Sequence, residues 1–418
     1  MADERLTLFR NASVLDAERG ELVRDRSVLV RGERIEAVGG TEVRADAARV
    51  VDLGGATLMP GLIDAHVHVT FVTADLSALA EWSPAYVTAR AAVVMRDMLR
   101  RGFTTVRDVA GADYGLAAAV EEGFIEGPRL IFGGKSLSQT GGHADFRDRG
   151  RYAFHQCGFS PAPGRICDGE HELRVAARDE IRRGAHHLKL MLGGGVASPN
   201  TRVGSVQFSL KEIRAVVDEA EAADIYVTGH AYTTRAANRG LENGVRCIEH
   251  GNLMDESTVA LMVDRKAFYV PTLVTESAMA ARGRQLGMSE ASHRKVLEVL
   301  ANGQRALELA HRAGVQIAYG TGLLGDMHDE QLGEFRLRAE VQPLTDVIRS
   351  ATTVAARLLR MEGEIGVVAA GASADLLVVD GDPLRDVEVL SDAERHLRLV
   401  MKAGRVHVDR LAVPALAP

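Results

Sequence analysis

The sequence predicts an α/β protein: a (β/α)8 TIM-type barrel with a small β-sandwich formed by the N- and C-terminal segments. Eight apolar, strand-like runs alternate with helical stretches in the middle of the 418-residue chain. Both ends show short strands and turns instead, and no low-complexity linker separates them from the middle. Alternating strands and helices indicate a parallel sheet. Eight such units favour a closed barrel over a doubly wound sheet, which remains the alternative.

The two ends of the chain are predicted to form one β module, from residues 1–60 and 362–418. Near the start, the segments are LTLFRNASVLD, RSVLVRGERIEAVGG and ARVVDLGGATLMPG; near the end, they are IGVVAAGASADLLVVDGDP and LRLVMKAGRVHVD. All are rich in Val, Leu and Ile and are interrupted by Gly, as short strands joined by turns are. The barrel is then expected over residues 61–361.

The barrel strands are expected where apolar runs recur. They are residues 62–69, 104–110, 129–134, 187–192, 226–232, 247–252, 267–274 and 316–322. Helical patterns lie between them, for example at 210–223 and 234–244. A long polar, Gly-rich stretch at 138–169 follows the third run, and we expect it to form a loop over the barrel mouth.

Composition excludes several classes of protein. A formal net charge of -7 argues against a non-specific nucleic-acid binder. The three cysteines, Cys157, Cys167 and Cys247, form no CxxC pair and are odd in number, which favours a reducing compartment. No secretory signal is visible at the start, and no uncharged apolar stretch reaches the roughly 20 residues that cross a bilayer. We expect a cytoplasmic protein with no membrane or nucleic-acid partner.

Histidines stand at the ends of several predicted strands. His66 and His68 are two residues apart, so an extended strand points both to the same face, where they could bind a divalent metal. His230 ends the run YVTGH and His250 ends CIEH. The carboxyl ends of barrel strands meet at the mouth, where barrel enzymes place their sites. Two structural histidines remain the alternative for the first pair.

Lys189 lies within HLKLML, in phase with His187 and Met191. A cationic Lys beside divalent metals would be repelled, and burial favours its neutral, nucleophilic amine. Such an amine can add carbon dioxide and become a carbamate, an anionic ligand able to bridge two metals. An ion pair with a carboxylate at the mouth is the alternative for this residue.

Taken together, these motifs resemble the amidohydrolase superfamily over essentially the whole chain. Its members carry HxH after strand 1, a carboxylated Lys on strand 4, His on strands 5 and 6, and Asp on strand 8. SQTGGHADFR, the CDG at 167–169, LMLGGGVASP, SVQFS, TGHAYT, IEHGN and the closing ADLLVVDGDP are similar to the branch of metal-dependent Xaa-Pro and Xaa-Arg/Lys dipeptidases and ochratoxin-hydrolysing amidohydrolases.

The resemblance implies two divalent metal ions and their ligands. His66, His68, Lys189, His230 and His250 would hold them, with a carbamate derived from CO2 on Lys189 and with His230 also part of the catalytic machinery. Zinc suits these ligands best, although other divalent ions fit. The resemblance also implies a homo-oligomer, with an octamer as one form.

Gly322 departs from the family pattern. Relatives carry GTDLLG where this chain reads GTGLLG, so the expected Asp falls at this glycine. In the family that Asp accepts a proton from the metal-bridging water, which attacks as hydroxide, and passes it to the leaving amine. Either the glycine was introduced to inactivate the enzyme, or the natural protein lacks the Asp and Asp326 or Asp329 partly replaces it. Glycine packs poorly in a strand and has no evident structural benefit here.

Substrate contacts are expected from His143 and Tyr232, whose counterparts in the branch hold the substrate's carboxylate or scissile carbonyl. A solvent-exposed loop His and a Tyr packed on the barrel rim are the alternatives. Arg147 and Arg149 could attract a carboxylate, and Met327 and His328 could line a side-chain pocket.

We therefore expect a metal-dependent hydrolase that cleaves an amide bond to a C-terminal amino acid and is impaired by Gly322. Candidate substrates are dipeptides ending in Pro, Arg or Lys, N-acyl amino acids and ochratoxin-like amides. Two alternatives are open. A mononuclear deaminase of the same superfamily would lack the strand 4 Lys, and a catalytically dead binding protein would explain Gly322.

Overall fold

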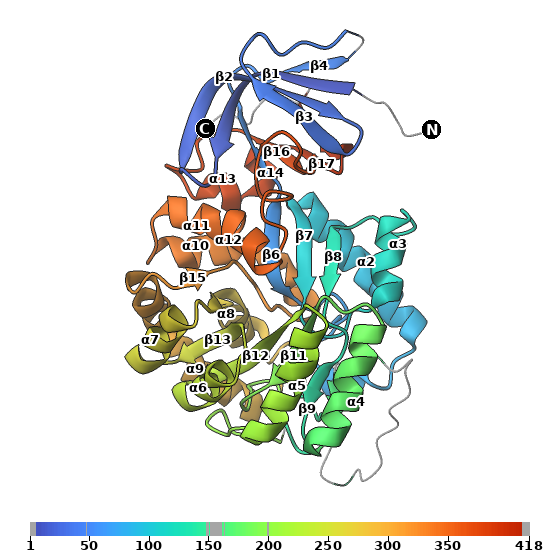
Figure 1. The fold of residues 1–418 in the computed structure, drawn as a ribbon, viewed down its shortest axis with the longest axis vertical. Coiled ribbons are helices and arrows are strands. Elements are labelled where there is room, and N and C mark those ends of the chain that lie inside the picture. Colours follow the sequence, from blue (N-terminus) through green and yellow to red (C-terminus); the bar gives the residue numbers. More distant parts are fainter. Residues whose placement is uncertain are drawn as a thin grey trace.

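The structure is a computed structural model that describes residues 6–46, 48–147, 150, 161–162, 164–198 and 200–411. Cys157 and Arg149, both singled out above, lie outside these residues. Strands from the two ends of the chain meet in one sheet, drawn in blue and red at the top of Figure 1. Among the described residues, no helix is both long and apolar enough to span a bilayer.

The terminal sheet has eight strands within the described part of the chain. They are β1 (Leu6–Asp16), β2 (Glu21–Arg31), β3 (Arg34–Gly39), β4 (Arg49–Asp52), β5 (Thr57–Pro60), β16 (Leu376–Val379), β17 (Leu397–Lys402) and β18 (Arg405–Asp409). β5 joins the two ends, because it pairs parallel with β1 and antiparallel with β16. Strands from both ends of the chain thus lie in one sheet, whereas the composite β-sandwich of residues 1–60 and 362–418 stays a prediction.

The middle of the chain carries two parallel sheets. One contains β6 (Leu62–Val67), β7 (Phe103–Asp108) and β8 (Arg129–Phe132); the other contains β9 (Ser136–Ser138), β10 (Gly164–Ile166), β11 (His187–Met191), β12 (Tyr226–Thr233), β13 (Cys247–Leu253), β14 (Phe268–Val270) and β15 (Gln316–Ile317). β7, β8 and β11 to β14 are buried at almost every position, because parallel strands are covered on both faces.

Backbone hydrogen bonds link the edges of these two sheets. His186 N–H donates to the carbonyl of Phe132, which joins β8 to the start of β11. On the other side, Ala65 N–H donates to Tyr319 O and Gly322 N–H to His66 O, which joins β6 to the residues after β15. The ends of β6, β11, β12 and β13 and the segment after β15 are thereby brought to one region.

Helices separate the strands along the chain. They are α1 (Leu76–Leu79), α2 (Pro84–Arg100), α3 (Tyr114–Glu121), α4 (Gly169–Arg182), α5 (Leu210–Ala222), α6 (Thr234–Glu242), α7 (Glu256–Asp264), α8 (Leu273–Arg282), α9 (Glu290–Arg312), η1 (Gly325–Leu332), α10 (Gly333–Ala339), α11 (Leu344–Ser350), α12 (Thr353–Leu358), α13 (Glu388–Ser391) and α14 (Ala393–His396). α5 shows why they form: Ser209 and Glu212 make a reciprocal capping box at its start.

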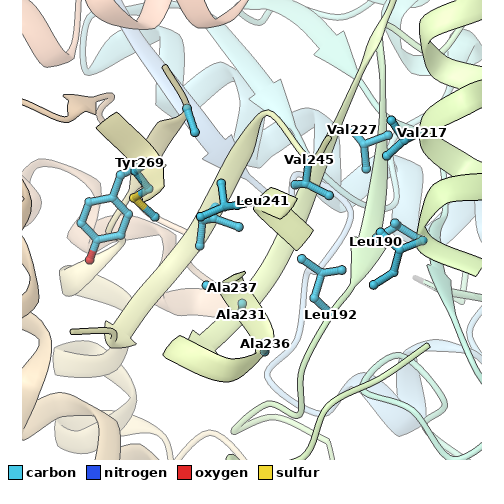
Figure 2. Close-up of a cluster of buried hydrophobic side chains, with 14 of the residues drawn as sticks. Leu190, Leu192, Val217, Val227, Ala231, Ala236, Ala237, Leu241, Val245 and Tyr269 are labelled. Carbon is cyan, nitrogen blue, oxygen red and sulfur yellow. The ribbon is translucent and has the colours of Figure 1, made fainter. Parts of the chain in front are cut away.

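The core lies where these helices cover the parallel strands. Figure 2 shows Leu190 of β11 and Val227 of β12 close to Val217 of α5, with Leu241 of α6 nearby, and all four are buried. Burying a Val or Leu side chain contributes about 1.5–3 kcal/mol. This packing fixes β11 to β13, which carry most of the residues considered next.

The eight runs expected to be barrel strands all contain a strand, but the strands in two of them, β14 and β15, are much shorter than expected. β14 stops at Val270, because Pro271 precedes Thr272, whose backbone is left-handed, and α8 begins at Leu273. β15 covers only two residues. The expected loop at 138–169 also contributes β10, which pairs with β9.

Candidate active site

A buried cavity lies at the carboxyl ends of the parallel strands. Its polar lining includes His66, His68, His143, Lys189, His230, Tyr232 and His250. Each of these side chains is at most 9% exposed. The rest of the described lining is mostly apolar, from residues such as Phe71, Leu76, Phe146, Val196, Met279 and Leu324. The side chains expected at the barrel mouth are thus gathered around one cavity, where they are largely buried.

His66 and His68 face each other through their Nε2 atoms, which are 3.3 Å apart. His66 Nδ1 lies 2.7 Å from a carboxylate oxygen of Glu249, and His68 Nδ1 lies 3.2 Å from the carbonyl of Ala110. Both partners are acceptors, so both Nδ1 atoms must carry the proton. The Nε2 lone pairs of the two rings then face and repel each other, and a cation between them would remove this repulsion.

Burial keeps these two rings neutral. It lowers the pKa of His66 to about 4, against the opposing effect of the Glu249 carboxylate. It also lowers the pKa of His68 well below its usual value, helped by the charges of neighbouring His66 and Lys189. Neutral imidazole is the form that binds metal ions.

His250 enters the cavity because the backbone turns at this position. Its φ is +73°, so the usual alternation of side chains along β13 breaks between Glu249 and His250, and both reach the interior. His250 Nδ1 lies 2.8 Å from Thr272 Oγ1, and its ring is centred 4.6 Å from that of His230. His230 Nε2 donates to the Gly194 carbonyl at 3.2 Å, which leaves its Nδ1 lone pair available.

Lys189 projects from β11 into the same cavity. Its side chain is 2% exposed, and its Nζ has no hydrogen-bond partner among the described residues. Burial lowers its pKa to about 8, which makes its neutral amine more accessible than that of an exposed lysine. No lining carboxylate among the described residues pairs with it, which removes the ion-pair alternative within that part of the chain.

The histidine and lysine nitrogens of the cavity are suitable ligands for a metal ion, although the imidazole rings are not arranged around a single point. Within the described ranges, no three His, Cys, Asp or Glu side chains stand where they could hold a single ion. The facing Nε2 lone pairs of His66 and His68 and the orphaned Nζ of Lys189 are nevertheless the atoms that a cation and a carbamate would satisfy. Binding would require the rings to turn from these positions.

Gly322 lines the cavity with a backbone that favours glycine. Its φ is +62°, which corrects the expectation that glycine brings no structural benefit here. A Cβ added at this position would meet Thr272 and His66 atoms no closer than 3.4 Å, so there is room for a side chain. Asp and Asn tolerate this backbone region better than other residues.

The two possible substitutes for the expected Asp lie elsewhere. Asp326 is largely exposed and pairs with Arg90 at 3.3 Å, and Asp329 pairs with Arg282 at 2.7 Å. Neither is among the residues that line the cavity. The expectation that one of them partly replaces a base at position 322 therefore has no support from this arrangement.

The structure brings His143 and Tyr232 to the cavity. His143 is buried and stacks on His230, with ring centroids 4.2 Å apart, rather than lying in solvent. Burial lowers its pKa to about 3, and its Nδ1 has no partner among the described residues. Tyr232 is 2% exposed, and its hydroxyl donates to Glu276 at 3.3 Å.

Other expected substrate contacts are placed differently. Met327 is buried in a hydrophobic cluster with Phe71 and Leu76, outside the set of cavity-lining residues. His328 lines a separate surface pocket beside α2. The guanidinium of Arg147 is held by Asp145, with its Nε 2.7 Å from a carboxylate oxygen.

Sequence reasoning missed a buried charged pair beneath the histidines. Arg107 and Glu249 are both fully buried and form an ion pair of 2.7 Å, and Glu249 also accepts from His66. The phase argument that singled out Lys189 would have found them, since each is a charged residue inside a buried strand.

Known proteins with similar sequences and structures share this arrangement of strands. A prolidase solved in complex with N-methylphosphonate-L-proline is 47% identical, with a TM-score of 0.94 over 96% of this chain and 99% of its own. A Xaa-Pro dipeptidase solved with bound methionine is 28% identical, with a TM-score of 0.86 over 96% and 99% of the two chains. Ochratoxinase of Aspergillus niger is 31% identical over 365 residues, 84% of this chain and 75% of the relative.

A family model covers most of the chain as well. The model of the Amidohydrolase family matches residues 57–406, which run from β5 to β18 and include every histidine and lysine of the cavity. The motif-based resemblance is thereby confirmed, including the branch that holds dipeptidases and ochratoxinase. The chain belongs to the amidohydrolase family and is a hydrolase of that superfamily.

Proposed function

We propose that this protein is a metal-dependent amide hydrolase whose substrate ends in an amino acid, built on a closed (β/α)8 barrel. The observation that carries the proposal is the cavity lined by five histidines and by Lys189, whose Nζ has no hydrogen-bond partner among the residues that the structure describes. The proposed ligands of two divalent ions, with Zn2+ the best fit, are His66, His68, Lys189 as its carbamate, His230 and His250. Such ions, when bound, act as Lewis acids and lower the pKa of water.

Substrate binding, exclusion of water and proton transfer depend on the side chains that line the cavity. Tyr232 and His143 face the cavity from β12 and from the segment after β9, and each can donate a hydrogen bond to a carboxylate or carbonyl oxygen. The apolar lining excludes water and accepts an apolar group. At Gly322 no side chain is available to take and return a proton, so we propose that the present chain hydrolyses its substrate slowly.

The lining narrows the substrate class. The described residues around the cavity include no Asp or Glu, which a substrate ending in Arg or Lys would need as a partner. The apolar side chains instead favour proline or another apolar residue. The prolidase and ochratoxinase relatives support this choice, because the one was solved with N-methylphosphonate-L-proline and the other is named for ochratoxin.

The experiment is a comparison of three proteins at position 322. We expect Gly322→Asp to raise kcat/KM on an N-acyl proline or Xaa-Pro dipeptide by at least about a hundredfold, the lower end of what a positioned proton carrier contributes. Gly322→Asn is the matched control, because Asn has the same size and tolerates the same φ but cannot act as a base. The three proteins are compared at equal metal content.

The outcomes separate the competing explanations. A rate gain in the Asp protein alone supports a hydrolase that lacks its base. Equal rates in all three would show that another group is the base or that the site does not hydrolyse amides. Activity on an aminated ring compound with a single metal bound would favour the deaminase alternative, which the buried Lys189 argues against.

A further inference from the structure

Glu249 is a buried carboxylate with several hydrogen-bond partners beside the cavity. It lies on β13 next to His250 and is fully buried. One of its oxygens accepts from His66 Nδ1 at 2.7 Å. The other accepts from Arg107 Nη2 at 2.7 Å and from the hydroxyl of Thr228 on β12. Three strands therefore converge on one carboxylate that stands directly behind a proposed metal ligand.

Arg107 fixes this carboxylate from the opposite side. Its Nε donates to the carbonyl of Ala65, the residue before His66, and its Nη1 donates to the hydroxyl of Tyr226 at 3.4 Å. The guanidinium thus touches both the backbone that carries His66 and the carboxylate that holds its ring. Arginine's rigid planar fork suits such a bridging role.

A buried ion pair is not explained by stability alone. Both charges lose their hydration on burial, and their mutual attraction often does not exceed that loss. Joining the strands is one reason, but apolar side chains would join them as well. The contact to His66 supplies another reason. An anionic acceptor at Nδ1 fixes the proton there, directs the Nε2 lone pair into the cavity, and makes that nitrogen a stronger ligand.

We propose that Glu249, oriented by Arg107, is a positioning residue that holds His66 in the tautomer and ring orientation required to bind a metal ion. The inference rests on the proposed function, and it concerns a residue outside the ligand set. It predicts that removing the charge of Glu249 weakens metal binding while the fold persists.

The test uses Glu249→Gln in the full-length protein. A Gln side chain has the same shape, but its amide can donate to His66 Nδ1 and so favour the wrong tautomer. Zinc affinity, measured by competition with a chelator, is expected to fall about 10–100-fold, as for other residues that orient metal-binding histidines. Glu334→Gln is the matched control: Glu334 pairs with Arg338 at 2.9 Å, both fully buried, without touching a histidine.

A second measurement needs no metal and does not depend on the Glu249→Gln variant. In metal-free wild-type protein labelled with 15N-histidine, we expect the His66 signals to show a protonated Nδ1 and an unprotonated Nε2. The His66 signals are identified by their loss in His66→Asn. A protonated Nε2 in the wild-type protein would overturn the inference directly.

The outcomes distinguish this inference from the proposed function. Weaker zinc binding in Glu249→Gln but not in Glu334→Gln supports positioning. Equal losses in both, or no loss in either, would overturn it, since the pair would then serve only the fold. Absence of zinc binding in wild-type protein would instead contradict the proposed function, and the tautomer measurement would still decide the role of Glu249.

Discussion

At the residue scale, the backbone decides which side chains reach the cavity. Three positions at successive strand ends, His250, Thr272 and Gly322, have positive φ values of 73°, 51° and 62°. Such conformations cost about 1–3 kcal/mol for residues other than glycine and gather at functional sites. They are linked to each other, because Thr272 contacts His250 and the Gly322 carbonyl accepts from Thr275. The strain is thus held in place by side chains of α8 and its cap.

The strain at position 322 predicts the effect of a side chain on stability. Gly322→Ala should lower the free energy of unfolding by about 1 kcal/mol, because an alanine at positive φ is strained even where space is available. Gly322→Asn should cost less, since Asn tolerates this region. Urea denaturation of both proteins measures the difference. An alanine variant as stable as the wild type would show that the backbone relaxes.

His143 and Tyr232 predict kinetic effects without loss of metal. In the Gly322→Asp protein, Tyr232→Phe and His143→Ala should each raise KM or lower kcat by about tenfold or more, because each removes a donor facing the substrate. Zinc content should stay constant in both. Loss of zinc with unchanged kinetics would assign these residues to the metal site instead.

At the element scale, the sequence predicted eight of the ten parallel strands in the described middle of the chain and missed β9 and β10. It also did not predict all strand lengths or all cavity residues. Apolar runs mark β11 to β13 clearly, because parallel strands are buried on both faces. β15 is short because the ladder to β14 ends after the bond from Ala318 N–H to Tyr269 O, and the next residue, Tyr319, donates to Ser350 O instead. β10 was not predicted, because a three-residue strand in a Gly-rich stretch is too short to show alternation of apolar and polar residues.

The sequence predicted the histidines of the candidate site but not the buried residues that hold those histidines in place. The i, i+2 spacing of His66 and His68 predicts one face, and the structure brings their rings together. Arg107 and Glu249 can each be noticed as a charged residue within an apolar run, but their pairing cannot be predicted, because it joins β7 and β13, which are remote in sequence. The positive φ of His250 was equally invisible, because only the folded backbone shows that the alternation breaks there.

A partly buried ion pair attaches the terminal sheet to the parallel strands of the middle of the chain, and this pair predicts a stability effect. Arg129 of β8 lies 2.6 Å from Asp375, whose side chain is 2% exposed and also accepts from Ala403 N–H. Asp375→Ala should destabilise the protein by about 2–3 kcal/mol, less than a fully buried pair because Arg129 is partly exposed. Glu36→Ala, which breaks the exposed pair with Arg31, is the control and should cost under about 1 kcal/mol. Equal effects would argue against a role in attachment.

At the scale of the whole molecule, buried histidines should make the metal-free protein sensitive to acid. Burial lowers the pKa of His66, His143 and His328 to about 4, 3 and 4. The unfolded chain binds protons on these groups below about pH 6.5, whereas the folded chain stays neutral down to about pH 4. These histidines therefore contribute to the free energy of unfolding in full above pH 6.5. That stabilisation is lost as the pH falls through 4.

Buried acids oppose this trend but are fewer. Burial raises the pKa of Asp64 to about 6 and that of Asp108 to about 7, so these groups favour the folded state at lower pH. We expect the histidines to dominate, because those at positions 68, 187, 230 and 250 shift in the same direction. Thermal melting of metal-free protein from pH 7 to pH 5 should show a falling Tm. A flat or rising Tm would show that the acids prevail.

Assembly and location remain predictions of the sequence. The family resemblance implies a homo-oligomer, with an octamer as one form, and light scattering of the purified protein would measure the mass against the 44.9 kDa chain. A mass equal to one chain would contradict that expectation.

Metal content tests the central claim most directly: the four histidines and Lys189 together hold two divalent ions. In the Gly322→Asp protein, reconstituted with zinc and bicarbonate, elemental analysis should find two ions per chain. In the same background, Lys189→Ala should hold at most one, because the carbamate bridge is gone. Two tightly held ions after Lys189→Ala would disprove the bridge, and no bound zinc in either protein would contradict the metal site altogether.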